Sequence, residues 1–264
     1  MARICPLFSG SSGNCYYVGS ATAGILIDAG RSAKQIEAKL KQWEIPMHVI
    51  QAVFVTHEHT DHVKGLRVLT AKYGIPVFSS LGTLQALERL ELLPSDIAIN
   101  LVEERGIECA GMWISTFEIQ HDCAQGVGFH ITTADDRTLA FATDLGCMTE
   151  QVRKNLLGSD FVVLESNHEE GMLRTGNYPY YLKRRILSDR GHLSNVACAE
   201  MLPELAQSGT ARFLLAHLSH ENNTPEIALQ TALCALQMKG LKKERDYEIS
   251  VAQRENENLG IILF

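Results

Sequence analysis

Five titratable side chains stand within six consecutive positions, in the segment HEHTDH that spans His57–His62. The segment follows the apolar run IQAVFVT, whose β-branched and aromatic residues predict a buried strand. His57 and His59 are two positions apart and can project to the same side of an extended chain. Asp61 and His62 follow, where the pattern indicates the start of a helix. Imidazole and carboxylate groups are ligands of Zn²⁺, Mn²⁺ and Fe ions, so the spacing predicts two adjacent metal sites.

The alternative interpretation of this segment is a solvated polar turn. Three imidazoles crowded behind a buried strand would then lose hydration without compensation, whereas a bound cation removes that cost. We therefore favour a metal site.

Three further residues of metal-ligand type end apolar runs elsewhere in the chain. His121 follows WISTFEIQ, Asp144 follows TLAFAT, and His217 follows ARFLLA. Any one of them alone would be as well explained by a structural role. Together with HEHTDH they form a set, and we expect them to join the same metal centre.

Short apolar runs alternate with helical patterns along the chain, which predicts layered sheets covered by helices in one domain over residues 1–264. The segment 167–191 has weak periodicity and is expected to be a loop or lid. We expect strands over 2–8, 15–19, 23–28, 50–56, 112–120, 126–133, 137–142, 160–165, 212–216, 246–252 and 258–264. We expect helices over 31–43, 63–73, 82–91, 149–157, 224–238 and from 194, where Ser194 is the expected N-cap, to about 205.

Composition narrows the class of protein further. The 264 residues are 45% hydrophobic and 21% charged, which suits an ordinary globular chain. The net charge of −7 argues against a broad basic surface for nucleic acid, although a local basic patch is compatible with it. Seven cysteines without a CxxC pair predict reduced thiols. With no signal-like start and no apolar run near the roughly 18 residues of a membrane helix, we expect a cytoplasmic protein without membrane association.

The order THEHTDH, His121, Asp144 in ATDLG and His217 in LAHLS resembles the metallo-β-lactamase superfamily over essentially the whole chain. The resemblance implies an α/β (α+β) fold: a four-layer αβ/βα sandwich of two mixed β-sheets flanked by helices. It also implies two divalent metal ions per chain, Zn, Mn or Fe. By this resemblance one ion is held by His57, His59 and His121, the other by Asp61, His62 and His217, and Asp144 bridges them.

Two residues beyond the ligands favour phosphodiester chemistry. His192 in GHLSN precedes a helical run, as does the catalytic histidine of the RNase Z and β-CASP nuclease branches. The run DFVVLESNH is similar to the RNase Z strand that ends in a catalytic glutamate, which corresponds to Glu165. The chain has neither an inserted tRNA-docking arm nor room for a β-CASP domain before His217. With SGSSGN and LAHLSHENN, the set is most similar to the YycJ/WalJ group, small bacterial hydrolases with DNA 5′-exonuclease-type activity.

The resemblance also implies a mechanism. Two metal ions clamp a phosphoryl group and activate the water between them. Asp61 orients or deprotonates that water, His192 protonates the leaving oxygen, and Glu165 holds the His192 imidazole. We therefore expect a nucleic acid substrate. No feature of the sequence indicates an oligomeric state.

Several residues are weaker candidates for contact with the substrate. Asn14 lies in the Gly/Ser-rich SGSSGN segment, which is either a simple hairpin turn or a loop that touches a phosphate. The segment 167–191 interleaves basic and aromatic residues, which suits phosphates and stacked bases but also suits a solvated loop. Its candidates are Asn167, His168, Tyr180, Lys183, Arg184 and Arg185. His220, three positions beyond His217, is a further candidate.

Two other functions stay open at this point. A small-molecule hydrolase, such as a cyclic phosphodiesterase, lactonase or thioesterase, would suit the acidic balance of the chain. A metal-binding regulatory protein with residual hydrolysis is the other.

Overall fold

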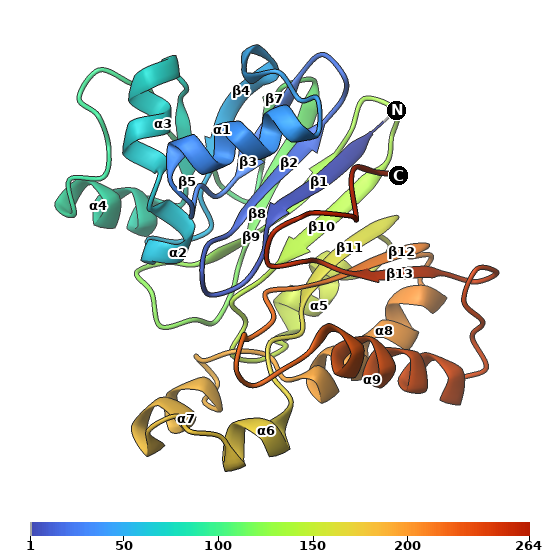
Figure 1. Ribbon diagram of the computed structural model, residues 1–264. Coiled ribbons are helices and arrows are strands. Elements are labelled where there is room, and N and C mark those ends of the chain that lie inside the picture. The colour runs from blue at the N-terminus through green and yellow to red at the C-terminus, as the bar shows by residue number, and fades with distance from the viewer. Residues whose placement is uncertain (1) are drawn as a thin grey trace.

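Two seven-stranded β-sheets lie face to face in the computed structural model, which describes residues 2–264 (Figure 1). The first sheet contains β1 (Arg3–Phe8), β2 (Cys15–Gly19), β3 (Gly24–Ile27), β4 (Ile50–Phe54), β5 (Val77–Ser79), β6 (Ile99–Leu101) and β14 (Ile262–Leu263). The second contains β7 (Ile107–Cys109), β8 (Met112–Glu118), β9 (Val127–Thr132), β10 (Thr138–Ala142), β11 (Phe161–Glu165), β12 (Arg212–Ala216) and β13 (Glu248–Val251).

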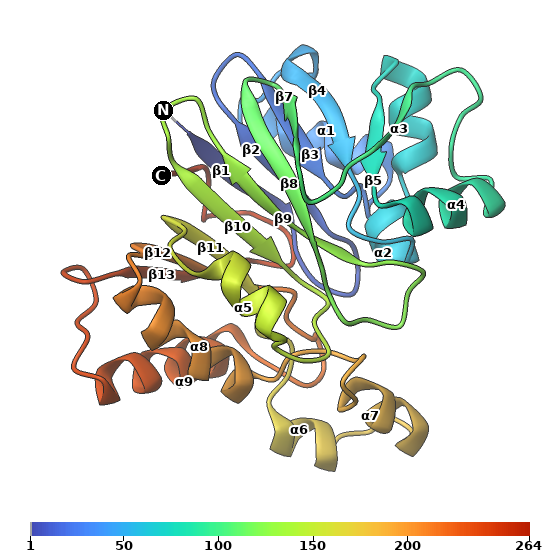
Figure 2. The same cartoon turned by 180° about the vertical axis from the view of Figure 1, so that it is seen from behind.

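Helices cover the outer face of each sheet, as Figures 1 and 2 show from opposite sides. The first sheet carries α1 (Ala33–Gln42), α2 (Thr60–Val63), α3 (Leu66–Tyr73) and α4 (Leu81–Arg89), with the short helix η1 (Met47–Val49) before β4. The second carries α5 (Glu150–Leu156), α8 (Asn195–Gln207) and α9 (Pro225–Met238). Two short helices, α6 (Glu170–Thr175) and α7 (Tyr180–Ile186), project from the end of the sandwich. The predicted four-layer sandwich is therefore confirmed.

Three apolar clusters hold the four layers together. One lies between the sheets, where Tyr16 of the first sheet meets Phe141 of the second edge to face at 4.9 Å between ring centroids. The other two lie between each sheet and its helices. Because the central strands are buried on both faces, their sequences read as continuous apolar runs. That is why the sequence predicted those strands well.

The two sheets share a topology that brings their functional ends together. The first is ordered β14-β1-β2-β3-β4-β5-β6 and the second β13-β12-β11-β10-β9-β8-β7. In each, antiparallel strands are followed by three parallel pairings, which begin at β3 and at β10. Parallel strands end at one edge of a sheet, and residues that follow them meet there. The predicted metal ligands follow strands of both sheets at this edge.

The segment 167–191, which we expected to be a loop or lid, contains two helices. The Glu169 side chain accepts from the backbone N–H groups of Gly171 and Met172 and begins α6, and Pro179 precedes α7. The two helices have six and seven residues, and their sequences form no clear 3.6-residue apolar period.

Three short strands were also not predicted. β5, β6 and β7 have three residues each, and β6 and β7 are partly exposed at sheet edges. The strand expected over 258–264 is only β14. The expected N-cap of α8 is confirmed, because the Ser194 side chain accepts from the N–H of Ala197. Among residues 2–264, no helix combines the length and the apolar character needed to span a bilayer.

Candidate metal centre

The structure brings all seven predicted metal ligands to the shared edge of the two sheets. His57 and His59 follow β4, and Asp61 and His62 belong to α2. The other three follow strands of the second sheet. Ligand atoms that lie within 4.8 Å of one another form four overlapping groups. These are His57–His59–His121, Asp61–His62–His217, His57–His62–Asp144, and Asp144–Glu165–His192–His217.

Three residues at this edge turn the chain through the left-handed region. Asp28 after β3, Asp144 after β10 and His217 after β12 have φ values of 62°, 61° and 55°. Few residues other than glycine adopt this conformation, and it is concentrated at functional sites. Here it ends each strand abruptly, and all three side chains are buried at the centre.

Two buried carboxylates orient two of the imidazoles. His62 Nδ1 lies 2.7 Å from Asp28 Oδ2, and His217 Nδ1 lies 2.8 Å from Glu165 Oε1. Asp28 also accepts from the N–H and hydroxyl of Thr56. When a carboxylate accepts from Nδ1–H, the other ring nitrogen, Nε2, keeps its lone pair for a metal ion.

Neutral groups orient two more imidazoles in the same way. His121 Nδ1 lies 3.0 Å from the carbonyl oxygen of Gly191, and His57 Nδ1 lies 3.0 Å from Thr56 Oγ1. All four rings therefore use Nδ1 for support and leave Nε2 for the cluster.

The inner atoms of the cluster lack hydrogen-bond partners. Within residues 2–264, no partner is found for the buried Nε2 atoms of His57, His121 and His217 or for Asp144 Oδ2. Asp144 lies between two groups, with Oδ2 3.3 Å from His62 Nε2 and Oδ1 3.8 Å from His121 Nε2. Buried polar atoms without partners are costly. A set of imidazole nitrogens and carboxylate oxygens in this state is suited to divalent metal ions.

The carboxylates divide the imidazoles into two kinds. Burial lowers the pKa of His62, but Asp144, Asp28 and Asp61 outweigh it and raise that pKa to about 9. The same balance, with Asp144 the strongest of the opposing charges, raises the pKa of His217. By contrast, burial and the neighbouring imidazoles hold the pKa of His57 well below its usual range. Without a cation, His62 and His217 therefore hold protons at neutral pH and His57 does not.

Glu165 connects the cluster to His192. Its Oε1 accepts from the Nδ1 atoms of both His192 and His217, each at 2.8 Å. Its Oε2 accepts from the backbone N–H groups of Leu145 and Leu193. Burial raises the pKa of Glu165, but the two imidazoles outweigh it and hold that pKa below its usual range. The group is therefore a carboxylate at neutral pH.

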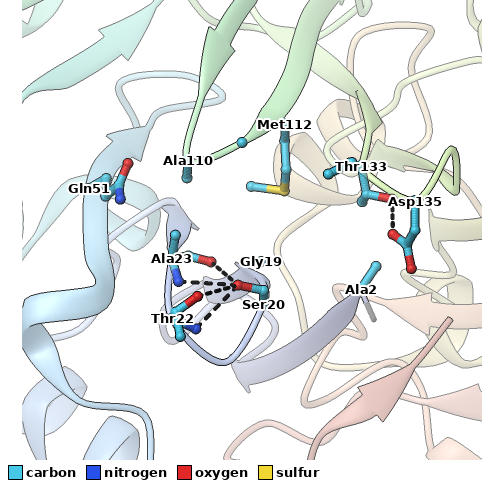
Figure 3. A pocket seen from close by; sticks show the side chains of 12 residues that line it. Ala2, Gly19, Ser20, Thr22, Ala23, Gln51, Ala110, Met112, Thr133 and Asp135 are labelled. Atoms are coloured by element: carbon cyan, nitrogen blue, oxygen red, sulfur yellow. Dashed lines mark hydrogen bonds between the residues drawn. The ribbon is translucent and has the colours of Figure 1, made fainter.

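A cavity of about 210 Å³ opens over the cluster. His59, Asp61 and His192 form part of its floor, and the α6–α7 segment supplies Tyr178 and Arg185 to its wall. A larger cavity of about 430 Å³ lies at the opposite end of the sheets (Figure 3). Its lining contains one carboxylate and no histidine. The Ser20 side chain is hydrogen-bonded to the backbone of Ala23, and the Thr133 side chain donates to Asp135. Chemistry rather than volume therefore marks the smaller cavity as the candidate site.

The predicted substrate contacts are distributed more widely than the ligands. Asn167 lines the cavity and donates to the carbonyl oxygen of His217. Asn14 is buried, and its amide nitrogen lies 3.1 Å from His62 Nε2. His168 is buried outside the cavity lining, and neither of its ring nitrogens has a partner within the described chain.

Three other predicted contacts do not line this cavity. Tyr180 is 76% exposed on α7, and Arg184 is exposed on the same helix. His220 is exposed and lines a neighbouring cavity, described below.

Sequence reasoning named Arg185 among the basic residues of the 167–191 segment but missed three other residues at the site, Asp28, Asp122 and Ser219. Asp28 ends the run ILI as Asp144 ends AFAT, so the shared pattern DxG after an apolar run was an available signal. Arg185 lines the cavity and pairs with Asp122 through two hydrogen bonds, and Ser219 also lines it. No local pattern distinguishes Asp122 and Ser219, because their place at the site depends on contacts with distant segments.

A family model and the folds of solved structures place the chain among known proteins. Residues 24–218 match a family model described as "Beta-lactamase superfamily domain", and the chain belongs to this superfamily. Among solved structures, the metallo-β-lactamase fold protein YhfI from Bacillus subtilis covers 100% of both chains with a TM-score of 0.75 at 14% identity. The short form of human tRNase Z covers 99% of this chain and 98% of its own with a TM-score of 0.63 at 15% identity. At these identities the likeness concerns the fold.

Curated relatives are closer in sequence. The chain is 38% identical to "Exodeoxyribonuclease YycJ" of Bacillus anthracis, over 92% of both chains. It is 34% identical to "Exodeoxyribonuclease WalJ" of Streptococcus pneumoniae, over 92% of this chain and 91% of the relative. The predicted resemblance to the YycJ/WalJ group is thus confirmed.

Asp28→Asn should weaken metal binding. The amide still accepts from Thr56 but no longer presents a carboxylate to His62 Nδ1, so the ring loses its fixed tautomer. We expect metal affinity to fall about 10- to 100-fold, measured by competition with a chelator for Zn²⁺ or Mn²⁺. Asp96→Asn, at an exposed position, is the matched control. Unchanged affinity in Asp28→Asn would contradict this role for Asp28.

Metal binding should release protons at pH 7.5. This pH lies below the pKa of about 9 for His62, so the ring is protonated in the metal-free protein and must lose a proton before Nε2 binds an ion. We expect calorimetry in buffers of different ionisation enthalpy to report at least one proton released, and affinity to rise with pH toward 9. Heats that are independent of the buffer would refute this.

Proposed function

We propose that the protein is a dinuclear-metal-dependent phosphodiesterase that hydrolyses DNA from an end, an exonuclease of the 5′ type. The observation that carries this proposal is His192, which lines the cavity beside the metal-ligand groups while Glu165 holds its Nδ1. An alkoxide is a poor leaving group, so phosphodiester hydrolysis gains from an acid of this kind. The relatives named exodeoxyribonucleases, similar along 92% of this chain, support the same activity.

Two ions, Zn, Mn or Fe, fit the side chains of the cluster. The group His57–His59–His121 would hold one and the group Asp61–His62–His217 the other, with Asp144 between them. When bound, the ions supply charge that stabilises the phosphoryl oxygens and lowers the pKa of water.

Asp61 is the proposed acceptor for the proton of the attacking water. Its side chain is 26% exposed and lines the cavity. Burial raises its pKa, but His62 and His217 outweigh this and hold the pKa of Asp61 below its usual range. Asp61 is therefore ionised at neutral pH and can accept a hydrogen bond from water.

His192 is the proposed acid that protonates the leaving oxygen. Glu165 Oε1 accepts from its Nδ1, which leaves Nε2 as the ring nitrogen available to a substrate. The ring is 16% exposed and lines the cavity, so a substrate bound there can contact it. Glu165 itself is buried and acts through His192, as a positioning residue.

The purified, metal-loaded protein should degrade DNA from the 5′ end. The measurement uses linear DNA labelled at either end, with RNA, bis(p-nitrophenyl) phosphate and a thioester as parallel substrates. Early release of the 5′ label, lost on treatment with a chelator, is the expected result. Hydrolysis of the thioester alone would overturn the proposal in favour of a small-molecule hydrolase. Bound metal without turnover of any substrate would favour a regulatory protein.

His192→Ala should lose activity while it keeps its metal ions. Removal of a general acid lowers rates about 10²- to 10⁴-fold, and we expect kcat on DNA to fall within this range. Metal content is measured on the same sample. His48→Ala, an exposed histidine before β4, is the control. Loss of one metal ion from His192→Ala would make His192 a ligand and refute its role as an acid.

A further inference from the structure

A second cavity, of about 130 Å³, adjoins the one over the metal-ligand cluster. The two share Ser11 and Ser219 in their walls. Three segments that are distant in sequence form it: the loop Ser9–Ser12 between β1 and β2, the residues that follow His217, and Arg254 beyond β13. The two cavities therefore adjoin at Ser11 and Ser219, beside the metal-ligand cluster.

The lining of this second cavity suits an anion. Arg254 Nε donates to Ser12 Oγ at 2.9 Å, and within residues 2–264 no carboxylate pairs with this guanidinium. His220, Ser11 and Ser219 line the same space. None of the described residues that line it is acidic, although the chain has a net charge of −7. Arginine with hydroxyl groups is a common set of donors to phosphate oxygens.

The loop in the wall is fixed relative to the metal-ligand cluster. Ser9 Oγ accepts from the backbone N–H of His217 at 2.9 Å, and Asn14 Oδ1 accepts from the N–H of Gly10 at 2.8 Å. Gly10 has a φ of 118°, and a side chain there would lie 2.9 Å from the carbonyl oxygen of Leu218. The distance between the two cavities is thus set by the fold.

We propose that the second cavity binds a phosphate of the substrate strand that neighbours the phosphate being cleaved. This inference rests on the proposed function and adds a specificity site to it. A strand would be held at two successive phosphates, one over the cluster and one beside Arg254. The bound phosphate is either a terminal monophosphate or an internal diester.

Short thymidine oligonucleotides test this proposal. TpT, pTpT and TpTp each have one cleavable linkage, and TpTpT has two, whose products are quantified separately. TpT carries only the cleavable phosphate, whereas pTpT and TpTp add a terminal phosphate on one side or the other, and TpTpT adds an internal diester. We expect at least one of the three longer substrates to exceed TpT at least tenfold in kcat/KM. Faster cleavage of pTpT or TpTp identifies a terminal phosphate, and faster cleavage of TpTpT alone identifies an internal one.

Arg254→Gln should remove this preference. We expect the ratio of kcat/KM between the preferred substrate and TpT to fall at least tenfold. The fall should come from a higher KM for the preferred substrate, with little change in kcat. Ser219→Ala, which removes one hydroxyl from the shared wall, should lower the same ratio to a smaller extent. Arg245→Gln is the matched control, because Arg245 is an exposed arginine that pairs with Asp246.

Three results would overturn the inference. One is wild-type protein that cleaves DNA but shows no preference for an added phosphate. Another is an Arg254→Gln variant that retains the preference. The third is an Arg254→Gln variant that loses activity equally on all substrates, which would indicate a structural role. If the wild-type protein cleaves neither DNA nor any dinucleotide, the proposed function fails first and this inference fails with it.

Discussion

The carboxylate of Glu165 is the constraint on which the site depends. It is buried, and one of its oxygens accepts from two imidazoles while the other accepts from two backbone N–H groups. These four donors compensate the cost of burying its charge. The consequence is that His217, beside Asp61 and His62, and His192, beside the cavity, cannot reorient independently. Glu165 ends β11, which pairs with β12, the strand that His217 follows, and the loop before α8 brings His192 to the same carboxylate.

The apolar core and the sheet topology hold these polar residues in place. Three apolar clusters fix four layers, and parallel strands deliver buried polar residues to one edge. The left-handed residues at the strand ends, Asp28, Asp144 and His217, are held in a conformation that is unfavourable in isolation. The core stabilises the chain enough to tolerate these conformations together with several unpartnered ring nitrogens.

The sequence predicted the parts of the site that local patterns encode. Each proposed ligand follows an apolar run or belongs to HEHTDH, so its place at a strand end could be inferred. The contacts made by the α6–α7 segment could not be inferred, because they depend on how two short helices pack. Arg184 and Arg185 show the difference, since one step along a helix turns a side chain by about 100°. We expected the basic residues of this segment at the substrate, whereas of Arg184 and Arg185 only Arg185 lines the cavity. Arg254 lies beyond β13 in sequence and reaches the site only through the fold.

The division of the metal-ligand groups between the two sheets has a consequence for the whole molecule. His57 and His59 come from the first sheet and His121 from the second, and Asp61 and His62 are likewise completed by His217. Neither sheet supplies all the residues of either of these two groups, so these two groups exist only when the sheets are stacked. An ion held by either group is therefore also a cross-link between the two halves of the sandwich. The binding free energy of such an ion would add to the free energy of unfolding.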